Sequence, residues 1–114
     1  MQDLIDKPWG TYETLSTGTD FNLKKIVVKP GCQPSYQYHS KRSEHWIIVS
    51  GECEVTLDDE KSLYSSNQHV FVPVGSKHRI KNTSSVNDLI FIEVQTGTYF
   101  GEDDIVRLED DYGR

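Results

Sequence analysis

Short stretches of alternating or continuously apolar residues, separated by glycine, proline and aspartate, make up most of the chain. Valine, isoleucine, threonine, tyrosine and phenylalanine dominate these stretches, which is the composition of β-strands. The stretches that predict strands are residues 11–15, 21–29, 43–49, 52–57, 69–72, 78–82 and 88–95. Turn signals recur between them about every ten residues, and this spacing is typical of an antiparallel sandwich or barrel. One of them, Asp58-Asp59, predicts a hairpin turn.

A single segment, residues 102–109, is a candidate for a helix, and it is short and acidic at its start. No repeat, low-complexity run or linker interrupts the rest. Since 114 residues is the length of one domain, we expect a single all-β domain over residues 1–114, with its core at about 7–97 and a tail at 98–114.

Two of the expected strands are apolar on both faces. In residues 44–49, Trp46 and Ile48 alternate with Ile47 and Val49, and residues 89–94 show the same feature. A strand that is buried on one face only alternates apolar with polar residues. Either the N-terminal strands or a second copy of the chain therefore covers the outer face. Because the chain has few spare strands, we expect a homodimer.

Composition and charge exclude several classes of function. The net charge of −6 argues against binding nucleic acid through its phosphates. The longest uncharged apolar stretches, 46–49 and 70–74, are too short to span a membrane, and no signal peptide is visible. Two cysteines, Cys32 and Cys53, are too few for a disulfide scaffold. We therefore expect a cytoplasmic protein that binds neither nucleic acid nor membranes.

Candidate metal ligands gather around two turns. Gln37 and His39 are two residues apart, so on a strand they point the same way, and Glu44 follows after the length of a tight turn. A second turn, 73–77, delivers His78 at the start of another strand. Two imidazoles, a carboxylate and an amide oxygen could surround one divalent ion, Zn, Fe, Mn, Co or Ni. The alternative is that these are ordinary polar residues at strand ends.

These residues also form a family-like pattern. The sequence resembles the cupin motifs, in which paired ligands are followed by a glutamate, a glycine and then PxGxxHxxxN. Gln37 stands where most cupins carry the first histidine, and the other matching positions are His39, Glu44, Gly51, Pro73, Gly75, His78 and Asn82.

Further segments make the resemblance more specific. They are 8–12 (PWGTY), 42–51 (RSEHWIIVSG), 92–97 (IEVQTG) and 101–107 (GEDDIVR), followed by Asp110, Tyr112, Gly113 and Arg114. Over residues 7–114 the chain is similar to the cupin domain of type II mannose-6-phosphate isomerases. That domain is usually the C-terminal part of bifunctional mannose-1-phosphate guanylyltransferase/mannose-6-phosphate isomerases.

The resemblance implies a small antiparallel jelly-roll barrel with one divalent metal ion, of which zinc is our first choice. Family members often have a histidine run where this chain has His39-Ser40-Lys41, and a site that used position 41 would be damaged by lysine. Gln37 paired with His39 keeps the spacing to the glutamate. We therefore expect the ligands to be Gln37, His39, Glu44 and His78.

Basic residues beside the two ligand turns, in an otherwise acidic chain, indicate a site for a sugar phosphate. The residues expected to bind the substrate are Lys41, Arg42 and Lys77, to which the family-like tail adds Arg107 and Arg114. Arg79 follows the inward-facing His78 and should point outward. A solvated rim is the alternative role of these charges.

Glu93 lies within an apolar strand, where an unpaired charge is costly, so we expect it to have a partner or a catalytic role. A structural ion pair is one possibility, and proton transfer is the other. By alternation His45 faces away from Glu44, and His69 begins a strand at the surface. Neither histidine is therefore expected among the ligands.

The resemblance implies metal-dependent interconversion of mannose 6-phosphate and fructose 6-phosphate through a cis-enediol. Such a reaction needs an electrophile, a base near the carbon acid and an anchor for the phosphate. Other interpretations are a cupin that acts on another sugar phosphate or a nucleotide sugar, a non-catalytic sugar-binding or regulatory module, and a metal-dependent oxygenase.

Overall fold

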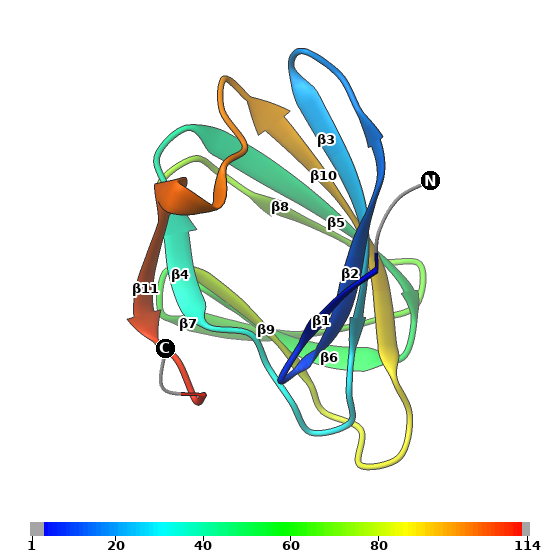
Figure 1. Ribbon diagram of the computed structural model, residues 1–114. Helices are drawn as coiled ribbons and strands as arrows, with labels where there is room; N and C mark the ends of the chain where they lie inside the picture. The colour runs from blue at the N-terminus through cyan, green and yellow to red at the C-terminus, as the bar shows by residue number, and fades with distance from the viewer. Residues whose placement is uncertain (1–3, 113–114) are drawn as a thin grey trace.

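Two antiparallel sheets face one another in the computed structural model, which describes residues 4–112 (Figure 1). The first sheet has the order β1 (Leu4–Lys7), β2 (Gly10–Thr17), β3 (Phe21–Val28), β10 (Leu89–Gly97), β5 (Arg42–Ser50) and β8 (His69–Val72). The second has the order β11 (Ile105–Glu109), β4 (Tyr36–His39), β9 (His78–Asn82), β6 (Glu52–Leu57) and β7 (Glu60–Ser65). The prediction of an all-β antiparallel fold is confirmed.

Tight turns connect the strands at the positions that the sequence marks. Asp58 and Asp59 both have positive φ, 49° and 70°, and form the turn between β6 and β7, as predicted. Gly51, with φ of 102°, carries the chain from β5 in one sheet to β6 in the other. A Cβ there would lie 2.9 Å from the carbonyl oxygen of Asp88, so only glycine allows this close passage.

The interior changes from apolar to polar along the strands. On β5 the buried residues Ile48 and Trp46 are followed toward the N-terminus by Glu44 and Arg42. On β10 the buried residues run from Leu89 and Phe91 to Glu93 and Gln95. Because β10 pairs with β5 so that Glu93 lies opposite Trp46 and Gln95 opposite Glu44, the two polar ends coincide. The fold thus builds an apolar core at one end of the barrel and a buried polar site at the other.

The outer face of the first sheet stays open. Ile47, Val49 and Phe71 are 45%, 49% and 46% exposed. The sequence allowed either the N-terminal strands or a second copy of the chain to cover this face. The N-terminal strands do not cover it, because β1 and β2 extend the sheet beside β3. In the part of the chain that the structure describes, this apolar face has no cover.

The prediction of a helix over residues 102–109 is wrong. A three-residue 3-10 helix, η1 (Glu102–Asp104), leads directly into β11, which pairs with β4. The free edge of β4 supplies the backbone partners, and Ile105 and Val106 are β-branched residues that favour a strand. Within residues 4–112 no helix has the length and apolar character needed to cross a membrane.

Candidate metal centre and cavity

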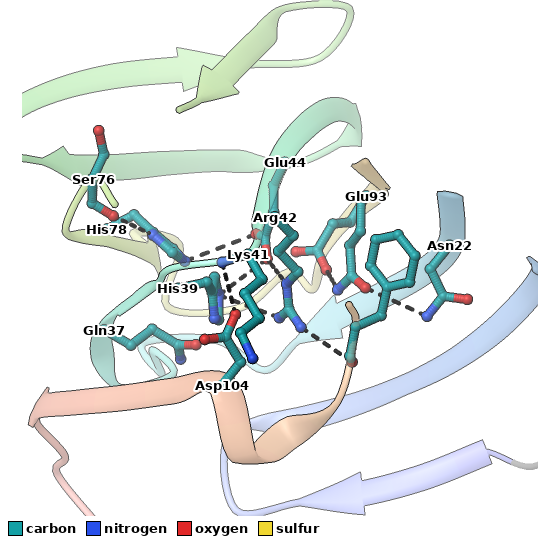
Figure 2. Close-up of polar contacts among 12 residues, drawn as sticks. Asn22, Gln37, His39, Lys41, Arg42, Glu44, Ser76, His78, Glu93 and Asp104 are labelled. Carbon is teal, nitrogen blue, oxygen red and sulfur yellow. Dashed lines mark hydrogen bonds and ion pairs between the residues drawn. The ribbon is translucent and has the colours of Figure 1, made fainter. Parts of the chain in front are cut away.

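Three buried side chains converge inside the polar end of the barrel. His39 comes from the end of β4, Glu44 from β5 and His78 from the start of β9, and their potential ligand atoms all lie within 4.8 Å of one another. His39 Nε2 is 3.2 Å from Glu44 Oε2, and His78 Nε2 is 3.8 Å from Glu44 Oε1. Figure 2 shows Glu44 and Arg42 between the two histidines on one side and Glu93 on the other.

Of the two histidines, His78 has the second hydrogen bond that orients a metal-binding imidazole, and His39 does not. His78 Nδ1 lies 3.0 Å from the carbonyl oxygen of Ser76 and donates to it, which leaves the lone pair of Nε2 facing Glu44. His39 Nδ1 is buried and has no hydrogen-bond partner. A nitrogen that binds a metal ion needs no such partner. Two imidazoles and a carboxylate are also good ligands for divalent transition metals, so the residues fit such an ion.

The cluster is charged as a metal site requires. Burial by itself raises the pKa of Glu44, but the hydrogen bond from His39, the positive charge that His78 carries at low pH and the charge of Arg42 hold that pKa well below its ordinary value. Burial lowers the pKa of His78, against the opposing effect of Glu44. An ionised carboxylate and a neutral imidazole are the protonation states that bind metal ions.

Arg42 lies in the interior, at the start of β5. Its Nε donates to Glu44 Oε2 at 3.1 Å and its Nη1 donates to the carbonyl oxygen of Phe100 at 3.3 Å. Its Nη2 lies 3.2 Å from His39 Nε2. Arg42 therefore neutralises the buried Glu44 and connects it to the segment that precedes η1.

Gln37 is the fourth expected ligand. It stands opposite His78 in the pairing of β4 with β9 and lines the same cavity. Its amide nitrogen donates to Ser35 Oγ at 2.8 Å. The amide oxygen is thus the atom that Gln37 can offer to an ion.

Glu93 lies beside the cluster on β10. The indole nitrogen of Trp46 donates to both Glu44 Oε1 and Glu93 Oε1, each at 3.0 Å, and Gln95 Nε2 donates to Glu93 Oε2 at 2.7 Å. Burial and the negative charge of Glu44 raise the pKa of Glu93 to about 8. Among the described residues no cation lies within ion-pair distance of Glu93, so the alternative of a structural ion pair is not what the geometry provides.

A cavity next to the cluster contains both aromatic and charged side chains. Trp9, Tyr12 and Phe91 form part of its wall, and Glu44 and Glu93 lie at the polar end. The basic residues that line it are Lys7, Lys24, Arg42, Arg79 and Arg107. Such a cavity suits a small polar molecule that carries negative charge.

The basic residues expected from the sequence divide into two groups. Arg42 and Arg107 line the cavity. Lys77 instead pairs with Asp59 at 2.8 Å, and the Lys41 ammonium lies over the ring of Tyr99, 5.1 Å from its centre. Arg114 lies outside the described residues.

Arg79 and Lys24 also belong to the cavity lining. The guanidinium of Arg79 pairs with Glu109 and Asp111 of the tail. Lys24 was missed, although it lines the cavity and lies opposite Glu93 in the pairing of β10 with β3. Its signal was available, because it shares alternation with the inward-facing Ile26 and Val28.

Comparison with known proteins gives one family. The family model described as mannose-6-phosphate isomerase C-terminal matches residues 1–110. The chain is 52% identical over 110 residues to the xanthan biosynthesis protein XanB of Xanthomonas campestris and 50% identical to the alginate biosynthesis protein AlgA of Pseudomonas aeruginosa. It is 45% identical to a mannose-1-phosphate guanylyltransferase of Salmonella montevideo. Each match covers 96% of this chain and 23% of the relative, so the chain spans about a quarter of their length.

Solved structures with low sequence identity share the fold. The capsular polysaccharide assembling protein CapF of Staphylococcus aureus has a TM-score of 0.79 at 23% identity, covering 96% of this chain and 34% of CapF. Oxalate decarboxylase of Bacillus subtilis has a TM-score of 0.82 at 18% identity, with coverages of 94% and 30%. The Cnp3 cupin domain of Schizosaccharomyces pombe has a TM-score of 0.76 at 16% identity, with coverages of 83% and 68%. The predicted cupin fold is confirmed.

Proposed function

Because this chain belongs to the mannose-6-phosphate isomerase C-terminal family, we propose that it interconverts mannose 6-phosphate and fructose 6-phosphate. The observation that carries the proposal is the buried cluster of His39, Glu44 and His78, with Glu93 beside it, at the polar end of a cavity with basic lining residues. The relatives are much longer proteins, so the proposal is that this domain has the isomerase activity by itself.

His39, Glu44 and His78, with the amide oxygen of Gln37, are the residues that would hold one divalent ion, for which zinc is the first choice and Mn, Co, Ni and Fe are alternatives. When bound, such an ion supplies a Lewis acid for the carbonyl and hydroxyl oxygens of the sugar. Arg42 keeps Glu44 ionised and oriented, and Ser76 fixes the tautomer of His78.

Glu93 is the proposed proton carrier. Isomerisation of the aldose removes a proton from C2, passes through a cis-enediol and returns a proton to C1. Glu93 lines the cavity, and the indole of Trp46 links it to the ligand Glu44. The raised pKa of Glu93, about 8, makes its ionised form a strong base, and that form can take the proton from C2 and return it to C1 on the same face of the sugar.

The phosphate needs a cationic anchor away from the ion. Lys24 and Arg107 line the cavity from opposite sheets, β3 and β11, and we assign the anchor to them. Lys41 near the tail remains a further candidate from the sequence, and so does Arg114. Lys77 is engaged by Asp59 and is left out.

An anaerobic assay of mannose 6-phosphate conversion to fructose 6-phosphate tests the proposal, using protein stripped by chelator and then supplied with single metals. We expect turnover that depends on the metal and is lost in His78→Ala but kept in Lys77→Ala. Saturable binding of mannose 6-phosphate without product under every metal would refute the isomerase and favour a binding module. Consumption of oxygen by the aerobic protein would favour an oxygenase.

The open apolar face of the first sheet supports a homodimer. Ile47, Val49 and Phe71 lie exposed on neighbouring strands of this face, and exposed apolar clusters of this kind mark interaction surfaces. We expect light scattering to give a mass near twice 13.1 kDa, and Ile47→Lys to reduce it to that of one chain. A wild-type mass near 13.1 kDa at micromolar concentration contradicts the dimer.

The expected compartment is the cytoplasm. Cys32 and Cys53 are both free thiols, which suits a reducing environment.

A further inference from the structure

Two histidines outside the cavity lie in contact on the outer face of the first sheet. His45 of β5 and His69 of β8 have Nδ1 and Nε2, respectively, 3.1 Å apart, and their rings stack with an interplanar angle of 17°. In the pairing of the two strands, His45 lies opposite Phe71 and His69 opposite Ile47. The histidines are therefore diagonal neighbours on one face.

The distance between the two nitrogens matches that of two ligands on one metal ion. With metal–nitrogen bonds of about 2.0 to 2.1 Å, two imidazole nitrogens of a tetrahedral site lie about 3.3 Å apart, and those of a square-planar site about 2.9 Å apart. The observed 3.1 Å falls between these values. From this geometry we infer that His45 and His69 form a second site for a divalent transition-metal ion, separate from the cluster inside the barrel.

His45 and His69 can bind a metal ion without releasing a proton from either ring. As a neutral pair they share one hydrogen bond, in which one nitrogen donates and the other accepts. A shift of that proton to the other nitrogen of its own ring leaves both facing lone pairs free for the metal. His69 is exposed and His45 is half-buried, so water or a group of another molecule can complete the coordination shell.

The donor set indicates which ions bind. Two imidazoles suit Cu²⁺, Ni²⁺ and Zn²⁺, whereas Mg²⁺ and Ca²⁺ prefer oxygen ligands. The site is also independent of the inner one. His45 follows Glu44 directly in the sequence, but alternation along β5 places them on opposite faces of the sheet.

Calorimetric titration of tag-free, metal-free protein with Ni²⁺ tests the inference, together with metal analysis after dialysis. We expect two classes of site in the wild type. His69→Gln should weaken Ni²⁺ binding at the exposed site by at least roughly 10- to 100-fold, because loss of an outer-shell partner already costs that much and His69 is a direct ligand. His78→Ala should lose the other class, so the two variants separate this inference from the proposed isomerase centre. A stoichiometry of one exposed Ni²⁺ ion per two chains that disappears in His69→Gln also supports the site. In that case a second copy of the chain completes the coordination shell.

Identical stoichiometry and affinities for His69→Gln and wild type would overturn the inference. A second measurement does not depend on the stability of the His69 variant. Substoichiometric Cu²⁺ added to ¹⁵N-labelled His78→Ala protein should broaden the amide signals of residues 45–47 and 69–71 first. Broadening spread over the acidic surface, with these signals unaffected, also contradicts the site.

Discussion

Replacing Arg42 by alanine should destabilise the metal-free protein, because the guanidinium is the buried cation next to Glu44. The side chains of Arg42 and Glu44 are only 4% and 3% exposed, and Nε of Arg42 donates to the carboxylate at 3.1 Å. Removing one partner of a buried ion pair typically costs about 3 to 5 kcal/mol, since the other charge remains buried without compensation. His39 and His78 still contact Glu44, so we expect the low end, about 3 kcal/mol.

Urea unfolding at pH 7, followed by tryptophan fluorescence, measures this change. With an m-value of about 1.5 kcal/mol/M, the midpoint of Arg42→Ala should fall by about 2 M. The control is Lys77→Ala, which removes a 2.8 Å ion pair between two exposed side chains, Lys77 and Asp59, and its midpoint should fall far less, because exposed ion pairs contribute little to stability. A saturating divalent metal ion should narrow the difference between Arg42→Ala and wild type, because the ion supplies the missing positive charge beside Glu44.

The difference in stability between wild type and Arg42→Ala should also become smaller as the pH falls. Since the folded-state pKa of Glu44 is depressed, partly by Arg42, its contribution to stability is complete above the ordinary value of 4.5. It is lost as the pH falls below 4.5 toward the folded-state pKa, so the two proteins should converge in acid. Equal urea midpoints for metal-free Arg42→Ala and wild type at pH 7 would show that Arg42 does not compensate a buried charge.

Three further variants test the remaining roles. Glu93→Gln should lower turnover by about 100-fold or more. Between about pH 4.5 and about 8 the folded protein keeps a proton on Glu93 that the unfolded chain has lost. The free energy of unfolding of the wild type should therefore fall as the pH rises through this range, and an equal pH dependence in Glu93→Gln would contradict the raised pKa. His78→Ala should lose most of the inner metal ion in elemental analysis, and full occupancy would exclude this ligand set. Lys24→Ala should raise KM for mannose 6-phosphate about tenfold or more with little change in kcat, whereas Lys77→Ala should not; equal KM values would move the anchor elsewhere.

The sequence by itself determined which residues face inward on the strand over residues 43–49. Alternation in residues 43–49 placed Glu44, Trp46 and Ile48 on one side, and these side chains are buried in the structure. It also placed His45 on the other side, where it meets His69. Alternation is a local property of extended backbone, so it can be read without knowing any partner strand. The spacing of His39, Glu44 and His78 around two turns likewise indicated the cluster that the structure brings together.

Only the tertiary structure decided which residues from distant segments share the cavity. Lys77 is a sequence neighbour of His78 but pairs with Asp59, whereas Lys24 reaches the cavity because β3 pairs with β10. The segment expected to be helical became β11 because the free edge of β4 offered it a partner. Strand register and sheet edges depend on contacts between residues far apart in the chain, and a local pattern carries no information about them.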